Sequence, residues 1–234
     1  MQYNLKMPGA ISLWKESWAL YKERFSPLLK ISALIFGLSI LTELVFPVEM
    51  KGDVQVFSWP YWVATMAVAI VAILCSIAMV YVIKDNAPVK DSLQKSTKIF
   101  WPYFFSSIIA GLIMGIGFVL LIVPGIIFSA WYGFIGLVVV IENIRYLKAL
   151  KRSKDYVKGH TLEVVLRWIF IMFILFLLLI PTFILNKNNT MASNIYADIV
   201  LLFYVPIIQI YTYLMYLHLK EIKNTQENMQ PSGV

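Results

Sequence analysis

Long apolar stretches alternate with short charged ones along most of the chain. The apolar stretches lie at residues 28–46, 61–83, 101–141, 162–185 and 195–219. A membrane-spanning helix needs about 20 mostly apolar residues, so four of these stretches each predict one span. The stretch 101–141 is too long for one helix, and Pro124-Gly125 near its middle predicts a helical hairpin of residues 102–123 and 125–141. The pattern therefore predicts six spans.

The expected fold class is all-α, a polytopic membrane protein. The six spans pair as three hairpins, and each hairpin follows a charged segment that we expect to form an amphipathic surface helix. The chain then divides into an N-terminal amphipathic helix (1–27), a six-helix membrane domain (28–219) and a short tail (220–234).

Composition supports this class and excludes others. The 234 residues are 60% apolar and only 14% charged, whereas soluble domains are about 45–50% apolar and about 25% charged. These proportions exclude a soluble domain and a disordered chain. Cys75 is the only cysteine, which excludes a disulfide-stabilised scaffold.

Basic residues fall almost entirely on one side of the predicted topology. Six spans place both termini on the same side, together with the segments 84–98 and 142–167. This side holds 18 of the 20 Lys and Arg residues, and the other side keeps Lys51 and Lys187. Because cytoplasmic segments are enriched in Lys and Arg, we expect both termini to be cytoplasmic.

The charged segments before spans one, three and five resemble one another. Ser92 to Ser96 aligns with Ala149 to Ser153, with a shared leucine and a shared serine, and Ser17 takes the serine position in the first segment. The alignment predicts one surface helix and one hairpin, repeated three times. The alternative is that polar linkers in any such protein acquire similar patterns.

Two of these segments have clear helical faces at about 100° per residue. In the third segment, Ser153 lies at the centre of a face whose other members are Tyr146, Ala149, Leu150, Tyr156 and Val157. In the first segment, the expected apolar face is aromatic and comprises Trp14, Trp18, Tyr21 and Phe25.

The basic residues opposite the apolar face of the third segment are its strongest charge signal. They are Lys148, Lys151, Arg152, Lys154 and Lys158. Because this helix should lie against the bilayer, we expect its cations to contact anionic lipid headgroups, and we expect no nucleic-acid partner. The same residues also determine topology, and the two roles are compatible.

Four polar residues lie within the predicted spans, where such groups are costly and often functional. They are Glu43, Asp198, Gln209 and His218. Glu43 and Asp198 lie near the outer ends, so we favour solvation at the outer rim over a ligand or ion role. Gln209 is expected to hydrogen-bond to a neighbouring helix, and His218 to meet headgroups or a helix C-terminal carbonyl.

Small residues predict close helix packing in spans three and four. The positions are Gly111 and Gly115 in the third span, with Gly117 nearby, and Gly133 and Gly136 in the fourth. A pore lined by glycine is the alternative for these positions.

The stretch from Leu121 to Gly159 resembles the membrane domain attached to some bacterial glycerophosphodiester phosphodiesterases, and related six-span membrane proteins. The residues that carry the resemblance are Pro124, Gly125, Glu142, Ala149, Leu150, Ser153 and Gly159. The resemblance implies a prokaryotic protein of the cytoplasmic (inner) membrane. No stretch resembles the phosphodiesterase domain, so that activity is not expected.

The residues of this motif also support four structural predictions without the resemblance. Pro124-Gly125 is expected to make the turn between spans three and four. Glu142 ends span four, and an ion pair to Arg145 is expected if the helix continues. Ser153 should let the surface helix approach the bundle closely, and Gly159 should end that helix.

The sequence contains no recognisable catalytic machinery. It has two histidines, no cysteine pair, no phosphate-binding glycine loop and no Gly-x-Ser-x-Gly motif. We therefore expect a non-enzymatic, lipid-interacting or accessory membrane protein without cofactor or metal, whose protein partners the sequence does not identify. A small-solute transporter or channel is the alternative, and a membrane enzyme is the third possibility.

Overall fold

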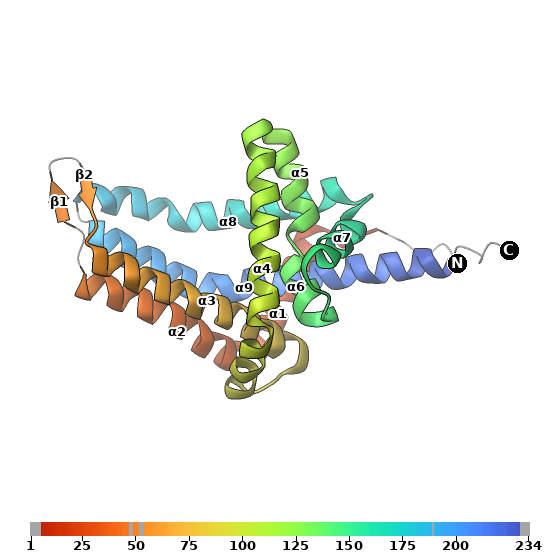
Figure 1. Ribbon diagram of the computed structural model, residues 1–234, viewed down its shortest axis with the longest axis horizontal. Coiled ribbons are helices and arrows are strands. Elements are labelled where there is room, and N and C mark those ends of the chain that lie inside the picture. Colours follow the sequence, from red (N-terminus) through yellow and green to blue (C-terminus); the bar gives the residue numbers. More distant parts are fainter. Residues whose placement is uncertain (1–5, 47–48, 52–53, 189, 230–234) are drawn as a thin grey trace. The chain divides into compact units, whose positions relative to one another are not determined.

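The computed structural model describes residues 6–46, 49–51, 54–188 and 190–229 (Figure 1). Helices form almost all of this part of the chain, in the order α1 (Ala10–Glu23), α2 (Phe25–Val45), α3 (Trp59–Asp85), α4 (Val89–Leu120), α5 (Ile122–Tyr132), α6 (Ile135–Glu142), α7 (Tyr146–Val157), α8 (Thr161–Asn188) and α9 (Thr190–Met229). One antiparallel hairpin of two short strands, β1 (Glu49–Lys51) and β2 (Val54–Val56), lies between α2 and α3. The predicted all-α class is confirmed.

Six helical segments within the described residues are long and apolar enough to cross a membrane. They are Phe25–Val45, Trp59–Asp85, Val89–Leu120, Ile122–Glu142, Thr161–Phe183 and Ala192–Asn228. Large apolar side chains are exposed along them, for example Trp59 (77% exposed) and Leu112 (63%), as expected where the surrounding solvent is lipid. The chain is a multi-pass membrane protein.

Two of the predicted spans are parts of longer helices. The charged segment before span three is not a separate helix, because α4 runs without a break from Val89 to Leu120 and contains Pro102. Span six continues to Met229, so most of the predicted tail is helical. Residues 1–5 of the predicted N-terminal helix and residues 230–234 of the tail lie outside the described part of the chain.

The turn between spans three and four lies three residues earlier than predicted. α4 ends at Leu120, and Leu121 adopts an extended conformation before α5 begins at Ile122. Pro124 and Gly125 therefore belong to the first turn of α5, where proline needs no hydrogen-bond partner for its nitrogen. The interpretation of Pro124-Gly125 as the turn itself is wrong.

The fourth span is interrupted in its middle. Gly133 and Phe134 separate α5 from α6. A Cβ on Gly133 would collide with the Trp168 side chain, and one on Gly136 would lie 2.8 Å from Tyr103 Cε2. The two glycines thus allow bulky aromatic rings to approach this span, which confirms their predicted packing role.

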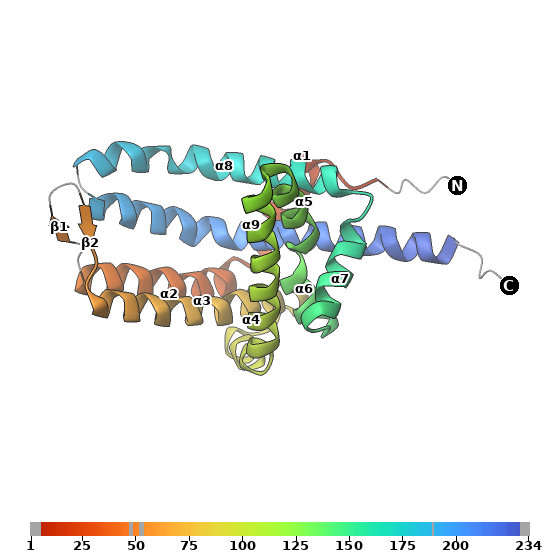
Figure 2. The ribbon, with the colours of Figure 1, turned by 45° about the horizontal axis from the view of Figure 1, so that its top comes forward.

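The helices form two compact units. One comprises the described residues within Tyr21–Thr97 and Met172–Ile208. In it α2, α3, the second half of α8 and the first half of α9 lie side by side in both ribbon views (Figures 1 and 2). The Arg24 guanidinium donates a 2.9 Å hydrogen bond to the Val82 carbonyl near the end of α3, which satisfies a carbonyl that the helix itself leaves unpaired.

The other unit comprises the described residues within Met1–Leu20, Lys98–Ile171 and Gln209–Val234. α4 and α5 form a helical hairpin in which a Cβ on Gly117 would lie 3.1 Å from Gly125 Cα. α7 packs against α5 and α6. This unit holds Glu142 and the basic residues of α7.

The face that α1 buries differs from the predicted aromatic face. Its buried residues are Leu13, Ser17 and Tyr21, spaced by four. Of the predicted aromatic face, Tyr21 is buried and the Trp14 ring packs edge-on against Phe170, whereas Trp18 is 42% exposed and Phe25 is 40% exposed. The aromatic stripe therefore forms only part of the contact with the rest of the protein.

Candidate functional site

The surface helix α7 has one buried face and one exposed face, as the sequence predicts. The buried residues are Ala149, Leu150, Ser153, Tyr156 and Val157. Tyr146 was expected among them but is 45% exposed. It begins the helix with a left-handed backbone (φ 54°), and its backbone N–H donates a 2.9 Å hydrogen bond to Ser106 Oγ.

A single carboxylate, that of Glu142, joins three helices at the base of α7. Its side chain is only 10% exposed. Four donors surround it: the hydroxyls of Tyr156 (2.6 Å) and Tyr216, Arg152 Nε (3.3 Å) and Lys220 Nζ (3.1 Å). These residues come from α6, α7 and α9, so Glu142 fixes α7 to the end of α6 and to the turn of α9 that carries Tyr216 and Lys220.

Burial and the Glu142 carboxylate together change the protonation behaviour of Tyr156. Burial raises the pKa of Tyr156 above its ordinary value, and the hydrogen bond to Glu142 raises that pKa further. The Arg152 guanidinium carbon also lies 4.7 Å from the centre of the Tyr156 ring, within cation–π distance. Tyr156 therefore remains a neutral hydrogen-bond donor at any physiological pH.

The predicted ion pair between Glu142 and Arg145 is wrong. α6 ends at Glu142, and Asn143 turns the chain with a left-handed backbone (φ 54°). The helical spacing that would bring Arg145 to Glu142 is therefore absent. Arg145 Nη2 instead lies 3.4 Å from Asn143 Oδ1, and Arg152 takes its place at Glu142.

Ser153 fulfils the role that its position predicts. It is completely buried, and its hydroxyl donates a 2.6 Å hydrogen bond to the Trp131 carbonyl of α5. Gly159 follows the end of α7 with φ 95°, a conformation that favours glycine. Ser153 and Gly159, two residues of the family-like motif, therefore have a structural reason to be present. The same holds for Ala149 and Leu150 in the buried face.

The five basic residues predicted to contact lipid divide into two groups. Arg152 is turned inward to Glu142, and Lys154 Nζ lies 4.1 Å from the centre of the Trp131 ring. Lys148, Lys151 and Lys158 are exposed. The prediction that all five face lipid phosphates is therefore too broad, because two of them contact the protein.

The exposed face of α7 also carries an apolar residue. Leu147 is 68% exposed and lies one helical turn before Lys151. Long lysine side chains keep their ammonium groups at a polar surface while apolar neighbours enter the acyl region. Leu147 and the three lysines together form what we call the α7 face.

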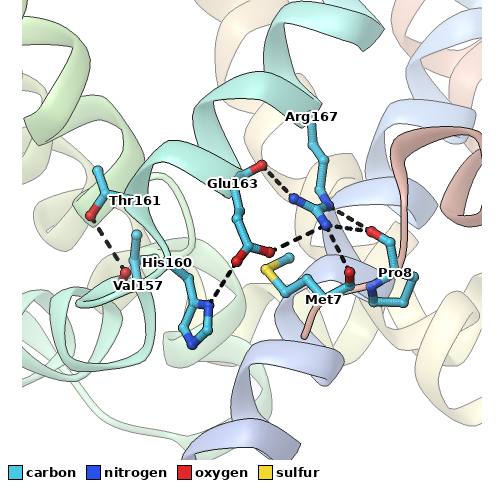
Figure 3. Close-up of polar contacts among 7 residues, drawn as sticks. All are labelled: Met7, Pro8, Val157, His160, Thr161, Glu163 and Arg167. Atoms are coloured by element: carbon cyan, nitrogen blue, oxygen red, sulfur yellow. Dashed lines mark hydrogen bonds and ion pairs between the residues drawn. The ribbon is translucent and has the colours of Figure 1, made fainter. Parts of the chain in front are cut away.

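Arg167 forms a second polar cluster, which the sequence analysis did not identify (Figure 3). This residue of α8 is only 7% exposed. Its guanidinium donates to the carbonyls of Met7 (3.0 Å), Pro8 (2.9 Å from Nε) and Glu163 (2.6 Å). Its position within the apolar stretch 162–185 was the available signal in the sequence, since a lone arginine there needs local partners.

The same cluster contains His160 and the Glu163 carboxylate. His160 Nδ1 lies 3.3 Å from Glu163 Oε1, and Arg167 Nη2 lies 3.5 Å from Glu163 Oε2 (Figure 3). All three guanidinium nitrogens of Arg167 donate hydrogen bonds to protein oxygens. The cluster therefore holds the segment before α1 against α8. Among the described residues, no group of three or more His, Cys, Asp or Glu is placed to hold a metal ion.

Glu43 and Asp198 lie close enough to interact electrostatically within the bundle of α2, α3, α8 and α9. Asn194 hydrogen-bonds to Glu43, and Ser39 hydrogen-bonds to Asp198. One carboxylate oxygen of each acid is buried and lacks a hydrogen-bond partner among the described residues. Both side chains are only half-buried, and their solvation at the outer rim stays a prediction.

The remaining two intramembrane polar residues have different surroundings. Gln209 is half-buried in α9, and its predicted hydrogen bond to a neighbouring helix stays a prediction. His218 is also half-buried, and its Nε2 lies 3.6 Å from Glu16 Oε2 of α1. The sequence did not predict this pairing with Glu16, and contact of His218 with headgroups stays a prediction.

No described residue packs closely against Gly111 or Gly115, so their predicted packing role stays a prediction. Both are exposed, and a Cβ at either position would have no atom within 4 Å. Gly117, on another side of α4, makes the close approach to α5. The spacing of small residues does not by itself identify the side of the helix that the fold covers.

No family model, no curated protein and no solved structure matches the chain. The resemblance to the phosphodiesterase-associated membrane domain therefore stays a prediction from the motif residues.

Proposed function

We propose that this protein is a non-enzymatic membrane protein that binds anionic phospholipid through the α7 face. The observation that carries the proposal is the exposure of Lys148, Lys151 and Lys158 around Leu147 on a helix whose opposite face is fixed to the protein. Glu142 and Ser153 supply that fixation. A positive, partly apolar face held rigidly beside a span fits an anionic bilayer surface.

The position of α7 along the chain supports the same conclusion. It follows the candidate span Ile122–Glu142 after three residues and precedes the candidate span beginning at Thr161 after three residues. Such short connections keep the helix near the membrane surface. The excess of Lys and Arg on this side argues that the surface is the cytoplasmic one.

The proposed orientation has a direct test. Reporters fused after Thr225 and within residues 52–53 should read as cytoplasmic and extracytoplasmic, respectively. A reporter after Thr225 that reads as extracytoplasmic would refute the arrangement of both termini in the cytoplasm.

The lipid proposal is tested by replacing Lys148, Lys151 and Lys158 together with glutamine. A basic residue near an anionic surface contributes about 1 kcal/mol, so the variant should lose at most roughly 100-fold in preference for anionic over zwitterionic lipid. The measurement is the ratio of phosphatidylglycerol to phosphatidylcholine that co-purifies with the protein, by mass spectrometry.

A matched control removes the same charge elsewhere on the same side. Its substitutions are Lys84→Gln, Lys90→Gln and Lys223→Gln. Wild type and control should retain the same lipid ratio, while the α7 variant retains less phosphatidylglycerol. Equal ratios in all three proteins would leave α7 with a topological role only and would refute lipid binding by this face.

One observation favours a different function, transport of a small solute or ion. Glu43 and Asp198 interact electrostatically, and one carboxylate oxygen of each lacks a hydrogen-bond partner among the described residues. Carboxylates in such positions often belong to substrate or ion pathways. Flux of a radiolabelled cation into proteoliposomes that is abolished by Asp198→Asn would support this alternative.

The family resemblance remains part of the proposal. Glu142, Ser153 and Gly159 occupy positions with specific contacts or backbone requirements, which is what a conserved structural motif would need. Replacement of these residues is therefore expected to disturb the placement of α7 before it disturbs the spans.

A further inference from the structure

The three surface segments share one register in the structure. Each helix begins seven residues before a completely buried serine: Ala10 before Ser17, Val89 before Ser96 and Tyr146 before Ser153. In each segment the residue four positions before that serine is also completely buried. The helix starts and the buried positions agree with the serine alignment, which supports the threefold repeat.

This register assigns equivalent positions on the outward faces of α1 and α7. The equivalent pairs are Ile11 with Leu147, Lys15 with Lys151 and Lys22 with Lys158. All six residues are exposed, and the two apolar residues are similarly so, at 64% and 68%. α1 therefore repeats the α7 face, with an apolar residue one turn before a lysine.

The second segment does not repeat this face. Its equivalent residues are Lys90, Gln94 and Trp101, so the apolar residue and the central lysine are both missing. Moreover, α4 continues directly into its span. The similarity of α1 to α7 is thus not a general property of charged segments in this chain.

The two acidic residues of α1 each lie beside a basic side chain or a histidine. Glu16 Oε2 lies 3.6 Å from His218 Nε2, and Glu23 Oε1 lies 3.5 Å from Arg24 Nη2. Only Arg24 separates α1 from the candidate span Phe25–Val45. At the other end of α1, Arg167 of the candidate span Thr161–Phe183 binds the Met7 and Pro8 carbonyls, so the chain on both sides of α1 is joined to a candidate span.

We propose that α1 is a second contact for anionic phospholipid, with Ile11 in the headgroup–acyl boundary and Lys15 at the lipid phosphates. This inference rests on the lipid-binding function proposed for α7. The occupant is the bilayer surface, because the pairing of an exposed apolar side chain with lysines beside a span fits anionic lipid.

The test places a nitroxide label at Ile11→Cys or Leu147→Cys in a Cys75→Ala background. The full-length protein is held in nanodiscs of phosphatidylcholine mixed with phosphatidylglycerol. Both labels should be more accessible to oxygen than to a water-soluble nickel complex, as lipid-exposed labels are. A label at Thr225→Cys serves as the aqueous control.

The charge of Lys15 is tested separately, in the protein with its native cysteine. Lys15→Gln should lower the ratio of co-purified phosphatidylglycerol to phosphatidylcholine by up to about fivefold. Lys223→Gln removes one charge from the end of α9 and should leave the ratio unchanged.

The outcomes separate the two proposals. A label at residue 11 that resembles the aqueous control, or that neither reagent reaches because a protein covers it, would overturn the role of α1. An unchanged lipid ratio in Lys15→Gln would do the same. An aqueous label at residue 147 would instead overturn the proposed function of α7, whatever α1 does.

Discussion

Replacing Glu142 with glutamine removes the negative charge on which α6, α7 and α9 converge. The variant keeps the shape of the side chain but leaves Arg152 and Lys220 without their carboxylate partner. Its amide also replaces one acceptor oxygen with an NH₂ group. This NH₂ group cannot accept a hydrogen bond from a donor such as the Tyr156 hydroxyl. The position is therefore expected to be more sensitive than any exposed acidic residue of the chain.

The magnitude follows from the burial of the three charged side chains. Removing one partner of a buried ion pair costs about 3–5 kcal/mol. Glu142 is 10% exposed, but Arg152 and Lys220 are 33% and 31% exposed and regain some hydration. We therefore expect a loss of about 3 kcal/mol, which for a chain of this length lowers Tm by about 6–12 °C.

The assay is thermal unfolding in detergent, followed by size-exclusion chromatography of the soluble protein. Glu23→Gln is the matched control, because Glu23 is 65% exposed beside Arg24 and such pairs contribute about 0–1 kcal/mol. Hydrogen exchange should also increase within α7 in the Glu142 variant but not in the control. If Glu142→Gln lowers Tm no more than Glu23→Gln does, Glu142 does not hold the three helices together.

Four further variants test other contacts. Gly136→Ala should lower the free energy of unfolding by about 1–3 kcal/mol, and Tm with it, because its Cβ would lie 2.8 Å from the Tyr103 ring. Gly111→Ala should leave Tm unchanged or raise it, because nothing lies within 4 Å of that Cβ. Equal effects of the two variants on Tm would refute this packing. Because the pKa of Tyr156 is raised by burial and by the hydrogen bond to Glu142, the folded state resists losing that proton, so stability should fall as pH rises above about 10. Tyr156→Phe should show a shallower fall in Tm over this range, and an identical slope would contradict the assignment. Arg167→Gln should speed hydrogen exchange in the segment before α1, since the guanidinium binds the Met7 and Pro8 carbonyls; unchanged exchange would show that this segment is held by other contacts.

The sequence alone determined the spans and the amphipathic face of α7. Both depend on local properties, namely the free energy of placing about 20 consecutive residues in lipid and the angular spacing of side chains on a helix. Ser153 and Gly159 were also predictable, because a small residue at the centre of a buried face and a glycine after a helix have local reasons.

Only the tertiary structure decided which residues meet across helices. Glu142 pairs with Lys220, 78 positions later in the sequence, and Arg167 binds carbonyls near the start of the chain. The tertiary structure also determines which small residues pack closely. Gly136 lies against Tyr103, whereas no described atom would lie within 4 Å of a Cβ on Gly111. In a bilayer, apolar helix faces gain little from choosing protein over lipid, so close fit and polar contacts between distant segments select the covered face, and no local pattern contains that information.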